Sequence, residues 1–507
     1  MSSSRVIGRL AAALLAMGLA LGLLFLPGDS ARADDEIVAG LNEQASVELN
    51  EPMFIEDVVG SSPEQVNYDE GGGEGLVTDA TIKAEPYKTA NGFKGWKVHV
   101  PDGRPLATPA VADGMVYVGG GFGTYDFYAF DAGNGNLRWQ YHCGDDGPTA
   151  AIVHNGRVAF NTESCILYVL DAKKGTKVWS QWLGDPLMAQ PAAAGDKIYI
   201  TYPGGDGHHY LTCRALENGG EVWKQPLIGE VITAPVINGG SVFCSTLEGT
   251  VYHFDADDGE LKWKDQKLAT SAPWVVGDEV YVSKRVEVAG EGGTTEQYEG
   301  IAGLGRGSGE IYNADELYAY GKADYLVHDP ESEYAEEQYE LDASVGFSSA
   351  PGEAKLDQAM SNVGVGTVSG VWAYQGSRPI VLDNKSYNAM GDAVRAVDVE
   401  SGKIIWEKQF KQGEERGGRA LTPPSYAGDN LYFGSTDGDV LCVRSGDGKE
   451  LWRFNVGEPI RFQPAVSDGK VFVGTDYGNI FCVDVKDPSA DGWPMWGGNA
   501  AHNGWEE

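Results

Sequence analysis

The sequence is poor in positive charge. Its 38 lysines and arginines face 74 aspartates and glutamates, so the formal net charge is −36. A basic surface of the kind that binds phosphate backbones is therefore absent, and we expect no nucleic-acid partner. A large net charge of one sign also keeps an exported protein soluble.

Cysteine is scarce as well, with six in 507 residues. No Cys-x-x-Cys-His motif is present, which argues against a covalently attached haem c. No cysteine precedes Cys143, so we expect no lipid-modified N-terminal cysteine. Covalent attachment of a haem or of an N-terminal lipid is therefore not predicted.

Long apolar runs are missing apart from Leu10–Leu26. Arg5 and Arg9 precede this run, and an Ala-Arg-Ala sequence ending at Ala33 follows it, which is the pattern of a signal peptide and its cleavage site. We predict a signal peptide over residues 1–33, and an exported chain in the periplasm or outside the cell. The run is short for a membrane span, so no integral span is expected after cleavage. An uncleaved anchor is the alternative.

Residues 34–91 contain a GGGEG sequence and acidic stretches with proline. Such a composition is typical of a flexible segment. We predict an acidic, flexible lead before the folded domain.

Against this background, a repeat centred on tryptophan stands out. Each of six tryptophans follows a glycine four positions earlier, as in FYAFDAGNGNLRW. The tryptophans are Trp139, Trp179, Trp223, Trp263, Trp406 and Trp452, and the glycines are Gly135, Gly175, Gly219, Gly259, Gly402 and Gly448. The alternating run predicts a half-buried strand, and the glycine predicts a hairpin turn with positive φ. The tryptophan begins the return strand and offers a flat face to a neighbouring unit.

A second element recurs eight times between the tryptophans. It is a small or polar residue, often followed by proline, then a strand, a polar turn and another strand, as in TPAVADGMVYVG. The copies begin at Thr108, Thr149, Gln190, Ala234, Ala272, Arg378, Thr422 and Gln463. Most copies are about 40 residues apart, which is the length of a four-stranded blade. The sequence therefore predicts an all-β, eight-bladed β-propeller with four-stranded antiparallel blades, over residues 92–496.

The ends of the repeat suggest how the ring closes. Trp96 to Val100 has the character of a return strand that precedes the first blade. We predict that this N-terminal strand is the outer strand of the last blade, which leaves no open radial edge. The alternative is that the C-terminal GWPMWGGNAAHNGW supplies that strand. Residues 497–507 are predicted to be a C-terminal tail.

The regular spacing of the repeat is interrupted once, between the fifth and sixth copies. These copies begin 106 positions apart, at Ala272 and Arg378, so about 65 residues exceed one blade. We predict a loop-rich insertion at about 285–371 in blade five, over one end of the central funnel or one flank. Its GIAGLGRGSGE sequence lacks the ending and context of a phosphate loop. The insertion could have a binding role, or it could be a family-specific addition without chemistry; the sequence leaves both open.

The A-x-D-x-x-x-G-x-x-x-W pattern resembles the tryptophan-docking repeat of the pyrroloquinoline-quinone (PQQ) quinoprotein superfamily, from Trp96 to about Trp496. That superfamily includes PQQ-dependent alcohol and sugar dehydrogenases. It also includes cofactor-free scaffolds of the BamB type, and exported proteins with a WPMWGG-like tail. The tail at Trp493–Gly498 is most similar to the last group. Likeness of fold does not choose among these functions.

For the dehydrogenases, the resemblance implies PQQ in the central funnel, with Ca²⁺ or a similar cation on carboxylate and amide oxygens. In the alcohol dehydrogenases it also implies an adjacent Cys-Cys disulfide. This sequence has no Cys-Cys pair, and the metal ligands do not map onto it residue by residue. We therefore predict a non-catalytic scaffold without a cofactor, which binds other envelope or exported proteins or a small ligand in the funnel. A periplasmic PQQ-dependent dehydrogenase of alcohols or sugars, with PQQ and Ca²⁺, is the alternative.

The residues that begin the innermost strands are predicted to ring the channel mouth. Because PQQ is a tricarboxylate, arginines in such a ring would suit it. The candidate cofactor contacts are Arg378, Gln190, Gln463, Arg419 and Arg461, with Thr108, Thr149 and Thr422 in the same ring. The alternative is that they are ordinary polar residues at a strand entrance.

The remaining cysteines and histidines predict little chemistry. Cys143 and Cys165 lie near loops of neighbouring blades, and export would permit a disulfide between them. The sequence does not show their Cα spacing, so that pairing stays open. His208 and His209 share a turn with Asp206, but no further ligand is implied and no metal site is predicted. Binding of a polysaccharide has no residue signature.

Overall fold

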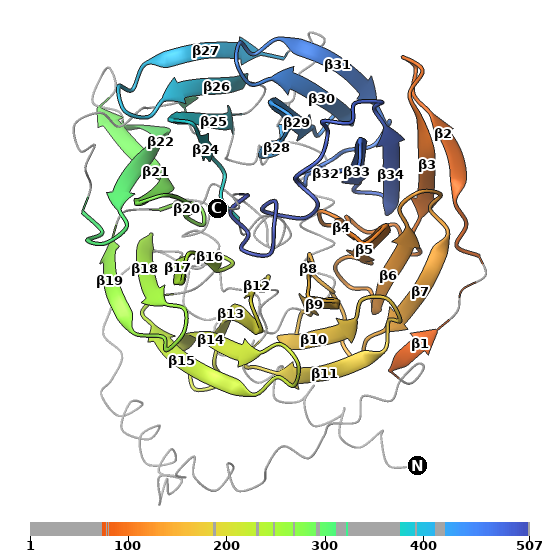
Figure 1. Ribbon diagram of the computed structural model, residues 1–507, viewed down its shortest axis with the longest axis horizontal. Helices are drawn as coiled ribbons and strands as arrows, with labels where there is room; N and C mark the ends of the chain where they lie inside the picture. The colour runs from red at the N-terminus through yellow and green to blue at the C-terminus, as the bar shows by residue number, and fades with distance from the viewer. Residues whose placement is uncertain are drawn as a thin grey trace, which may run out of the picture. The chain divides into compact units, whose positions relative to one another are not determined.

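The computed structural model describes residues 74–77, 79, 81–185, 189–229, 233–246, 249–266, 269–289, 295–310, 321–322, 376–390, 393–410 and 421–504. All of these residues lie in one compact unit, Asp69–Glu507. They form eight antiparallel sheets arranged in a ring around a common axis, as Figure 1 shows. The predicted eight-bladed β-propeller is therefore confirmed. No helix in the described part of the chain is long and apolar enough to cross a membrane.

Blades 1 to 4 follow one another along the chain. Blade 1 contains β4 (Ala110–Ala112), β5 (Met115–Gly119), β6 (Asp126–Asp131) and β7 (Leu137–His142), with β1 (Gly75–Val77) added at its outer edge. Blade 2 contains β8 (Ile152–His154), β9 (Arg157–Asn161), β10 (Ile166–Asp171) and β11 (Lys177–Trp182). Blade 3 contains β12 (Ala192–Ala194), β13 (Lys197–Pro203), β14 (His209–Ala215) and β15 (Glu221–Leu227). Blade 4 contains β16 (Val236–Asn238), β17 (Ser241–Ser245), β18 (Thr250–Asp255) and β19 (Leu261–Gln266).

Blades 5 to 8 complete the ring. Blade 5 contains β20 (Trp274–Val276), β21 (Glu279–Ala289), β22 (Thr295–Gly305) and β23 (Gly321–Lys322). Blade 6 contains β24 (Ile380–Leu382), β25 (Lys385–Met390), β26 (Ala393–Asp398) and β27 (Ile404–Gln409). Blade 7 contains β28 (Ser425–Ala427), β29 (Asn430–Gly434), β30 (Asp439–Arg444) and β31 (Glu450–Asn455). Blade 8 contains β32 (Ala465–Ser467), β33 (Lys470–Gly474), β34 (Asn479–Asp484), β3 (Lys94–His99) and β2 (Glu85–Lys88).

The tryptophan and glycine of the repeat meet across neighbouring blades. Gly175 in blade 2 has φ of 70°, and a β-carbon placed on it would lie 2.5 Å from Cδ2 of Trp139 in blade 1. The Trp139 indole Nε1 also donates a hydrogen bond to the carbonyl oxygen of Ala172, at 3.0 Å. Only glycine therefore gives both the turn and the space for the indole. The residue pair joins one blade to the next.

The ring closes through the N-terminal strand. β3 pairs antiparallel with β34, from Lys94 opposite Asp484 to His99 opposite Asn479. The predicted closing strand is confirmed, and the C-terminal alternative is wrong because the tail lies at the centre of the ring (Figure 1). β1 and β2 both fall within residues 34–91, the predicted flexible lead. The ordered sheets thus begin earlier than predicted. β1 and β2 form hydrogen bonds with the outer edges of β7 and β3, which would otherwise be unpaired.

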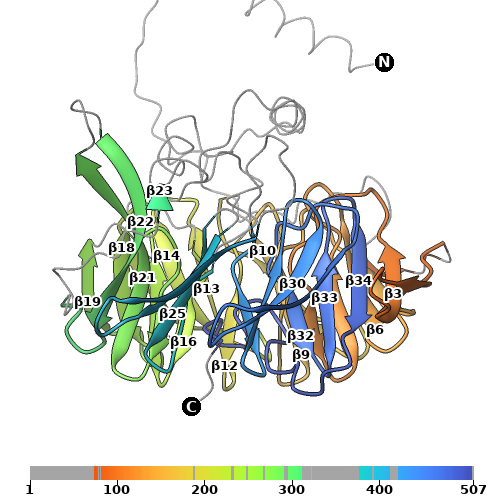
Figure 2. The same ribbon diagram turned by 90° about the horizontal axis from the view of Figure 1, so that it is seen from above.

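Blade 5 corrects the predicted start of the insertion. β21 and β22 pair continuously from Glu279 opposite Gly305 to Ala289 opposite Thr295. Residues 285–305 therefore belong in part to a long hairpin, which rises beyond one face of the ring in Figure 2. The turn that follows β22 has the repeat geometry, because the Trp263 indole donates to the Arg306 carbonyl oxygen at 2.7 Å. Most of the predicted insertion beyond residue 310 lies outside the described residues.

Candidate functional site

The innermost strand of each blade is only three residues long, and its inner edge faces the channel. Four of these strands donate the backbone N–H of their central residue to the C-terminal tail. The donors and acceptors are Val111 to Pro494 at 2.6 Å, Ala193 to Ala500 at 2.9 Å, Ile237 to Ala501 at 3.0 Å and Val466 to Trp493 at 2.7 Å. Backbone groups that would otherwise be open sheet edges are thereby satisfied. The tail joins blades 1, 3, 4 and 8 across the channel.

Aromatic side chains fill the space between the tail and the inner wall. Trp493 is 1% exposed and stacks on Trp274 of β20, with ring centroids 6.2 Å apart and planes at 4°. The Trp493 indole Nε1 donates to Gln463 Oε1 at 3.1 Å. Gly504 lies against both tryptophans, and a side chain there would overlap them. The tail is thus a fitted plug between the inner strands.

His502 lies inside this plug. It is 2% exposed and packs edge-on against Trp496, with ring centroids 4.1 Å apart. Neither ring nitrogen has a hydrogen-bond partner among the described residues. Burial lowers the pKa of His502 well below its usual range, so the imidazole is neutral near pH 7. Sequence reasoning missed this residue, because no spacing or motif marks the tail as a channel plug.

Two of the uncharged residues predicted at the channel mouth, Gln463 and Thr108, make hydrogen bonds across boundaries between blades. Gln463 is 2% exposed, donates through Nε2 to the Pro424 carbonyl oxygen, and accepts from Trp493 of the tail. Thr108 Oγ1 donates to the Gln463 carbonyl oxygen at 2.8 Å, across the boundary between blades 1 and 8. Thr149, Thr422 and Gln190 are buried as well. These side chains are components of the inner wall.

The charged candidates have different surroundings. Arg461 Nε donates to Asp476 Oδ2 at 2.6 Å, and Asp476 is 6% exposed. Burial raises the pKa of Asp476, while the nearby Arg461 guanidinium acts to lower it. Arg378 is half-buried just before β24, and Arg419 lies outside the described residues. Arg461 therefore has a carboxylate partner within the protein itself.

The cysteines are reduced in the structure. All six are free and buried, so the candidate disulfide between Cys143 and Cys165 is not formed. Burial raises the pKa of the Cys143 thiol strongly, and raises that of Cys165 to about 12. Buried thiols with raised pKa values are unreactive packing groups.

The histidine pair is part of a polar hairpin end. Asp206 accepts hydrogen bonds from the Tyr210 hydroxyl at 2.5 Å and from the His208 backbone N–H at 3.1 Å. Among the residues that the structure describes, no three His, Cys, Asp or Glu side chains form a metal-binding group. Asp206 is thus engaged in shaping the turn.

Two carboxyl groups meet where a loop of blade 1 approaches blade 2. Burial, together with the neighbouring Asp146, raises the pKa of Glu163 to about 8. The Glu163 backbone N–H donates to the Asp146 carbonyl oxygen at 2.9 Å, which holds the two residues together. Like charges this close disfavour ionisation of both, so the pair retains a proton near neutral pH.

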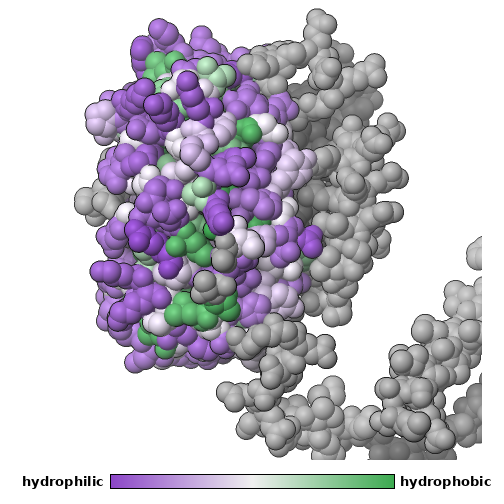
Figure 3. Space-filling view, turned by 90° about the vertical axis from the view of Figure 1, so that its right-hand side faces the viewer, coloured by the Kyte–Doolittle hydropathy of each residue, from purple (hydrophilic) through white to green (hydrophobic). Residues whose placement is uncertain are grey.

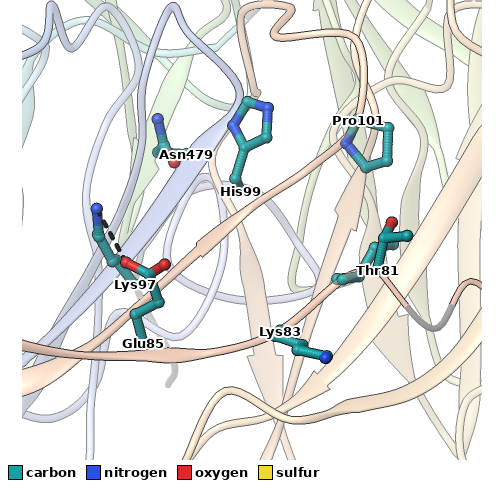
Figure 4. A pocket seen from close by; sticks show the side chains of 8 residues that line it. Thr81, Lys83, Glu85, Lys97, His99, Pro101 and Asn479 are labelled. Atoms are coloured by element: carbon teal, nitrogen blue, oxygen red, sulfur yellow. Dashed lines mark ion pairs between the residues drawn. The ribbon is translucent and has the colours of Figure 1, made fainter.

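A pocket of about 420 Å³ opens on the outer rim of blade 8. Figure 4 shows Lys83, Lys97, His99, Thr81 and Asn479 around it. Lys97 Nζ lies 3.3 Å from Glu85 Oε2, the ion pair drawn in the same view. The pocket combines positive and polar side chains with the buried Ile82.

Known proteins resemble this chain in sequence and in fold. Residues 78–210, 163–295 and 390–493 match the family model described as "Outer membrane protein assembly factor BamB". The chain is 26% identical to BamB of Bordetella pertussis, over 59% of this chain and 84% of that protein. It is 29% identical to a quinoprotein ethanol dehydrogenase of Pseudomonas aeruginosa, over 23% of this chain and 17% of that protein. The structure of BamB from Moraxella catarrhalis aligns with a TM-score of 0.50 and 15% identity, over 79% of this chain and 100% of that one.

Proposed function

Because the chain belongs to the PQQ-repeat β-propeller family, we propose that it is a non-catalytic scaffold that binds other exported proteins. The observation that carries this proposal is that the chain's own tail lies across the channel. Four innermost strands are hydrogen-bonded to the chain's own tail, and Trp493 and Trp496 are both almost fully buried there. A propeller whose centre is occupied by its own chain offers its loops and rim to partners.

The described inner wall is a poor fit to a quinone. PQQ would need cationic and polar groups that are available to its carboxylates. Gln463 bonds the tail and a neighbouring blade, and Arg461 is held by Asp476. The tail residues packed against this wall include Trp493 and Gly504, which carry no charge. The described residues therefore support no oxidation step.

The similarity to dehydrogenases calls for a direct test of the alternative. Purified protein is mixed with PQQ and Ca²⁺, and cofactor absorbance and dye reduction are followed with alcohols and aldoses. The scaffold proposal expects no stoichiometric PQQ binding and no substrate-dependent reduction. Saturable PQQ binding with substrate-dependent dye reduction would contradict the scaffold proposal and support the dehydrogenase alternative.

A second experiment looks for the partners. A photo-crosslinking amino acid is placed at Tyr125, Ile228 or Tyr477, which are 47%, 71% and 47% exposed on three different blades. We expect discrete adducts with exported proteins from at least one of these positions in the native cells. The same amino acid at the buried Phe160 is the control. Equal labelling at exposed and buried positions, or no adduct at any, would contradict the proposal.

A further inference from the structure

His502 is buried in the tail, where its surroundings do not suit an ionisable side chain. Only 2% of the residue is exposed, and neither ring nitrogen has a hydrogen-bond partner among the described residues. By contrast, the outer side of the ring in Figure 3 is mainly hydrophilic, with small apolar patches. A histidine on that side would ionise in water, whereas the imidazolium of His502 could be hydrated only outside its site.

Two features of His502 raise the free energy of the docked tail. A buried imidazole N–H without an acceptor loses the hydrogen bond that it makes in water. The backbone of His502 has φ of 58°, in the left-handed region that few residues other than glycine adopt. An apolar side chain would make the same edge-on contact with Trp496 without the first of these costs. What the histidine adds is a group that titrates near neutral pH.

The part of the tail before the paired glycines is firmly attached. Trp493 exchanges two backbone hydrogen bonds with Val466, at 2.7 and 3.0 Å, as a short strand would. Its indole stacks on Trp274 and donates to Gln463. Residues 493–496 contain no ionisable side chain, so this anchored part has no proton to gain as the pH falls.

The part after the glycines, residues 499–504, is attached by single backbone bonds, and we call it the distal tail. Gly497 and Gly498 join it to the anchored part, with φ of 73° and 87°. Its bonds to the inner strands come from Ala193 in β12 and Ile237 in β16, at 2.9 and 3.0 Å. Such a segment can open locally while the blades themselves stay folded.

Among the described residues, no opposite charge faces His502 from the elements packed against the distal tail. β12, β16 and β20 contain no ionisable side chain. The segment that packs on Trp496 through Gly376 includes Arg378, which is a cation and gives an imidazolium no counter-charge. Burial alone accounts for the lowered pKa of His502. A proton on the docked ring would therefore be a buried, unpaired charge.

We propose that protonation of His502 releases the distal tail from the channel, so that the distal tail is an acid-sensitive lid on the inner wall. Release frees the backbone N–H groups of Ala193 and Ile237. It also uncovers the edge of the Trp274 ring that Gly504 contacts. These groups then line an open channel.

The direction of the pH dependence follows from the two states. Above pH 6.5, the ordinary pKa of histidine, the imidazole is neutral in both states and the distal tail stays docked. Below that pH, the released form binds a proton that the docked form does not, so the ratio of released to docked tail rises up to about tenfold per pH unit. The Glu163–Asp146 pair has the opposite sign, because it stabilises the fold as the pH falls. His253 has a pKa of about 4, so it is mostly neutral at pH 5 and above.

The test measures hydrogen exchange of the full chain by mass spectrometry, with each rate divided by the intrinsic rate at the same pH. Between pH 7.5 and pH 5.0, we expect the protection of Ala193 and Ile237 to fall by about thirtyfold, as a pKa of about 6.5 in the released tail requires. Val466, which bonds the anchored part, should keep its protection. So should Thr422, whose N–H donates to Gly434 within blade 7 at 3.0 Å.

Substitutions separate titration from packing. His502→Gln has no group that ionises in this range, and His502→Asn combines that property with a residue that tolerates positive φ. Both should remove the fall in protection between pH 7.5 and pH 5.0, whatever their protection at pH 7.5. His208→Gln, at an exposed histidine of the polar hairpin end, is the matched control and should keep the fall.

Three results would overturn the proposal. The first is equal protection of Ala193 and Ile237 at the two pH values in the wild-type chain. The second is an equal fall at Val466 and Thr422, which would mean that the whole ring unfolds. The third is a fall that persists in both His502 variants.

Discussion

The smallest unit of this fold is the contact between a tryptophan and the glycine of the next blade. Six tryptophan indoles donate to a carbonyl oxygen of the following blade, at 2.7 to 3.2 Å. The contact residues in the following blade include Gly135, Gly175, Gly219, Gly259, Gly309 and Gly448. Trp452 is different, because it packs edge-on against Phe93 of the closing hairpin, at 5.6 Å. One type of contact is thus repeated around the ring and adapted where the ring closes.

Substitution of the glycine tests this contact. Gly175→Ala adds a β-carbon 2.5 Å from Trp139 on a residue with φ of 70°. We expect the free energy of unfolding, measured in urea, to fall by at least about 2 kcal/mol, because strain and overlap add. Gly156→Ala is the control, with φ of 71° and no atom within 4 Å of the new carbon. The free energy of unfolding of Gly156→Ala should fall by only about 1 kcal/mol. Equal losses in the two variants would contradict the packing argument.

The Glu163–Asp146 pair predicts a pH dependence. The folded-state pKa of Glu163, about 8, exceeds the ordinary value of 4.5. The folded protein therefore holds a proton that the unfolded chain releases, and stability falls as pH rises from about 4.5 towards 8. Glu163→Gln removes this dependence, so it should raise the melting temperature at pH 7.5 and have little effect at pH 4.5. Glu400→Gln, at an exposed carboxylate, should change neither value; a pH-independent effect of Glu163→Gln would refute the assignment.

At the scale of elements, the structure of the closing hairpin could be predicted in part from its sequence, whereas that of the tail could not. The alternating pattern near Trp96 predicted β3 and its place beside β34. The tail has no such pattern, and its backbone bonds are spread over four different blades, with a reciprocal pair to Val466 of blade 8. β1 and β2 were missed because strands of three and four residues are too short to show a period.

Removal of Trp493 tests the tail as a structural plug. Trp493→Ala leaves a cavity beside Trp274, and we expect a loss of about 3 to 5 kcal/mol. Hydrogen exchange at the amides of Val111, Ala193 and Ile237 should accelerate, because their acceptors lie in the tail. Trp182→Ala, at a tryptophan that is 55% exposed, is the control and should change stability by less than about 0.5 kcal/mol. Unchanged exchange at the three amides in Trp493→Ala would exclude a plugging role.

For the whole molecule, the balance of charge governs its response to salt. A net charge of −36 destabilises the compact state through self-repulsion, and salt screens that repulsion. The ion pairs on the surface weaken with salt but contribute little each. We therefore expect the melting temperature to rise between 20 mM and 500 mM NaCl at pH 7.5, as followed by circular dichroism. A falling melting temperature would mean that the ion pairs outweigh the net charge.

The sequence by itself determined the number of blades, the turn at each glycine and the contact that joins successive blades. These features depend on residues a few positions apart, so a local pattern such as Gly135 and Trp139 is enough to specify them. The tertiary structure alone decided the environment of the predicted channel ring. Thr108 meets Gln463 across 355 positions of sequence, and Gln463 meets the tail, so their roles follow from closure of the ring. The rim pocket likewise exists only because β3 pairs with β34 while the chain before β2 packs elsewhere.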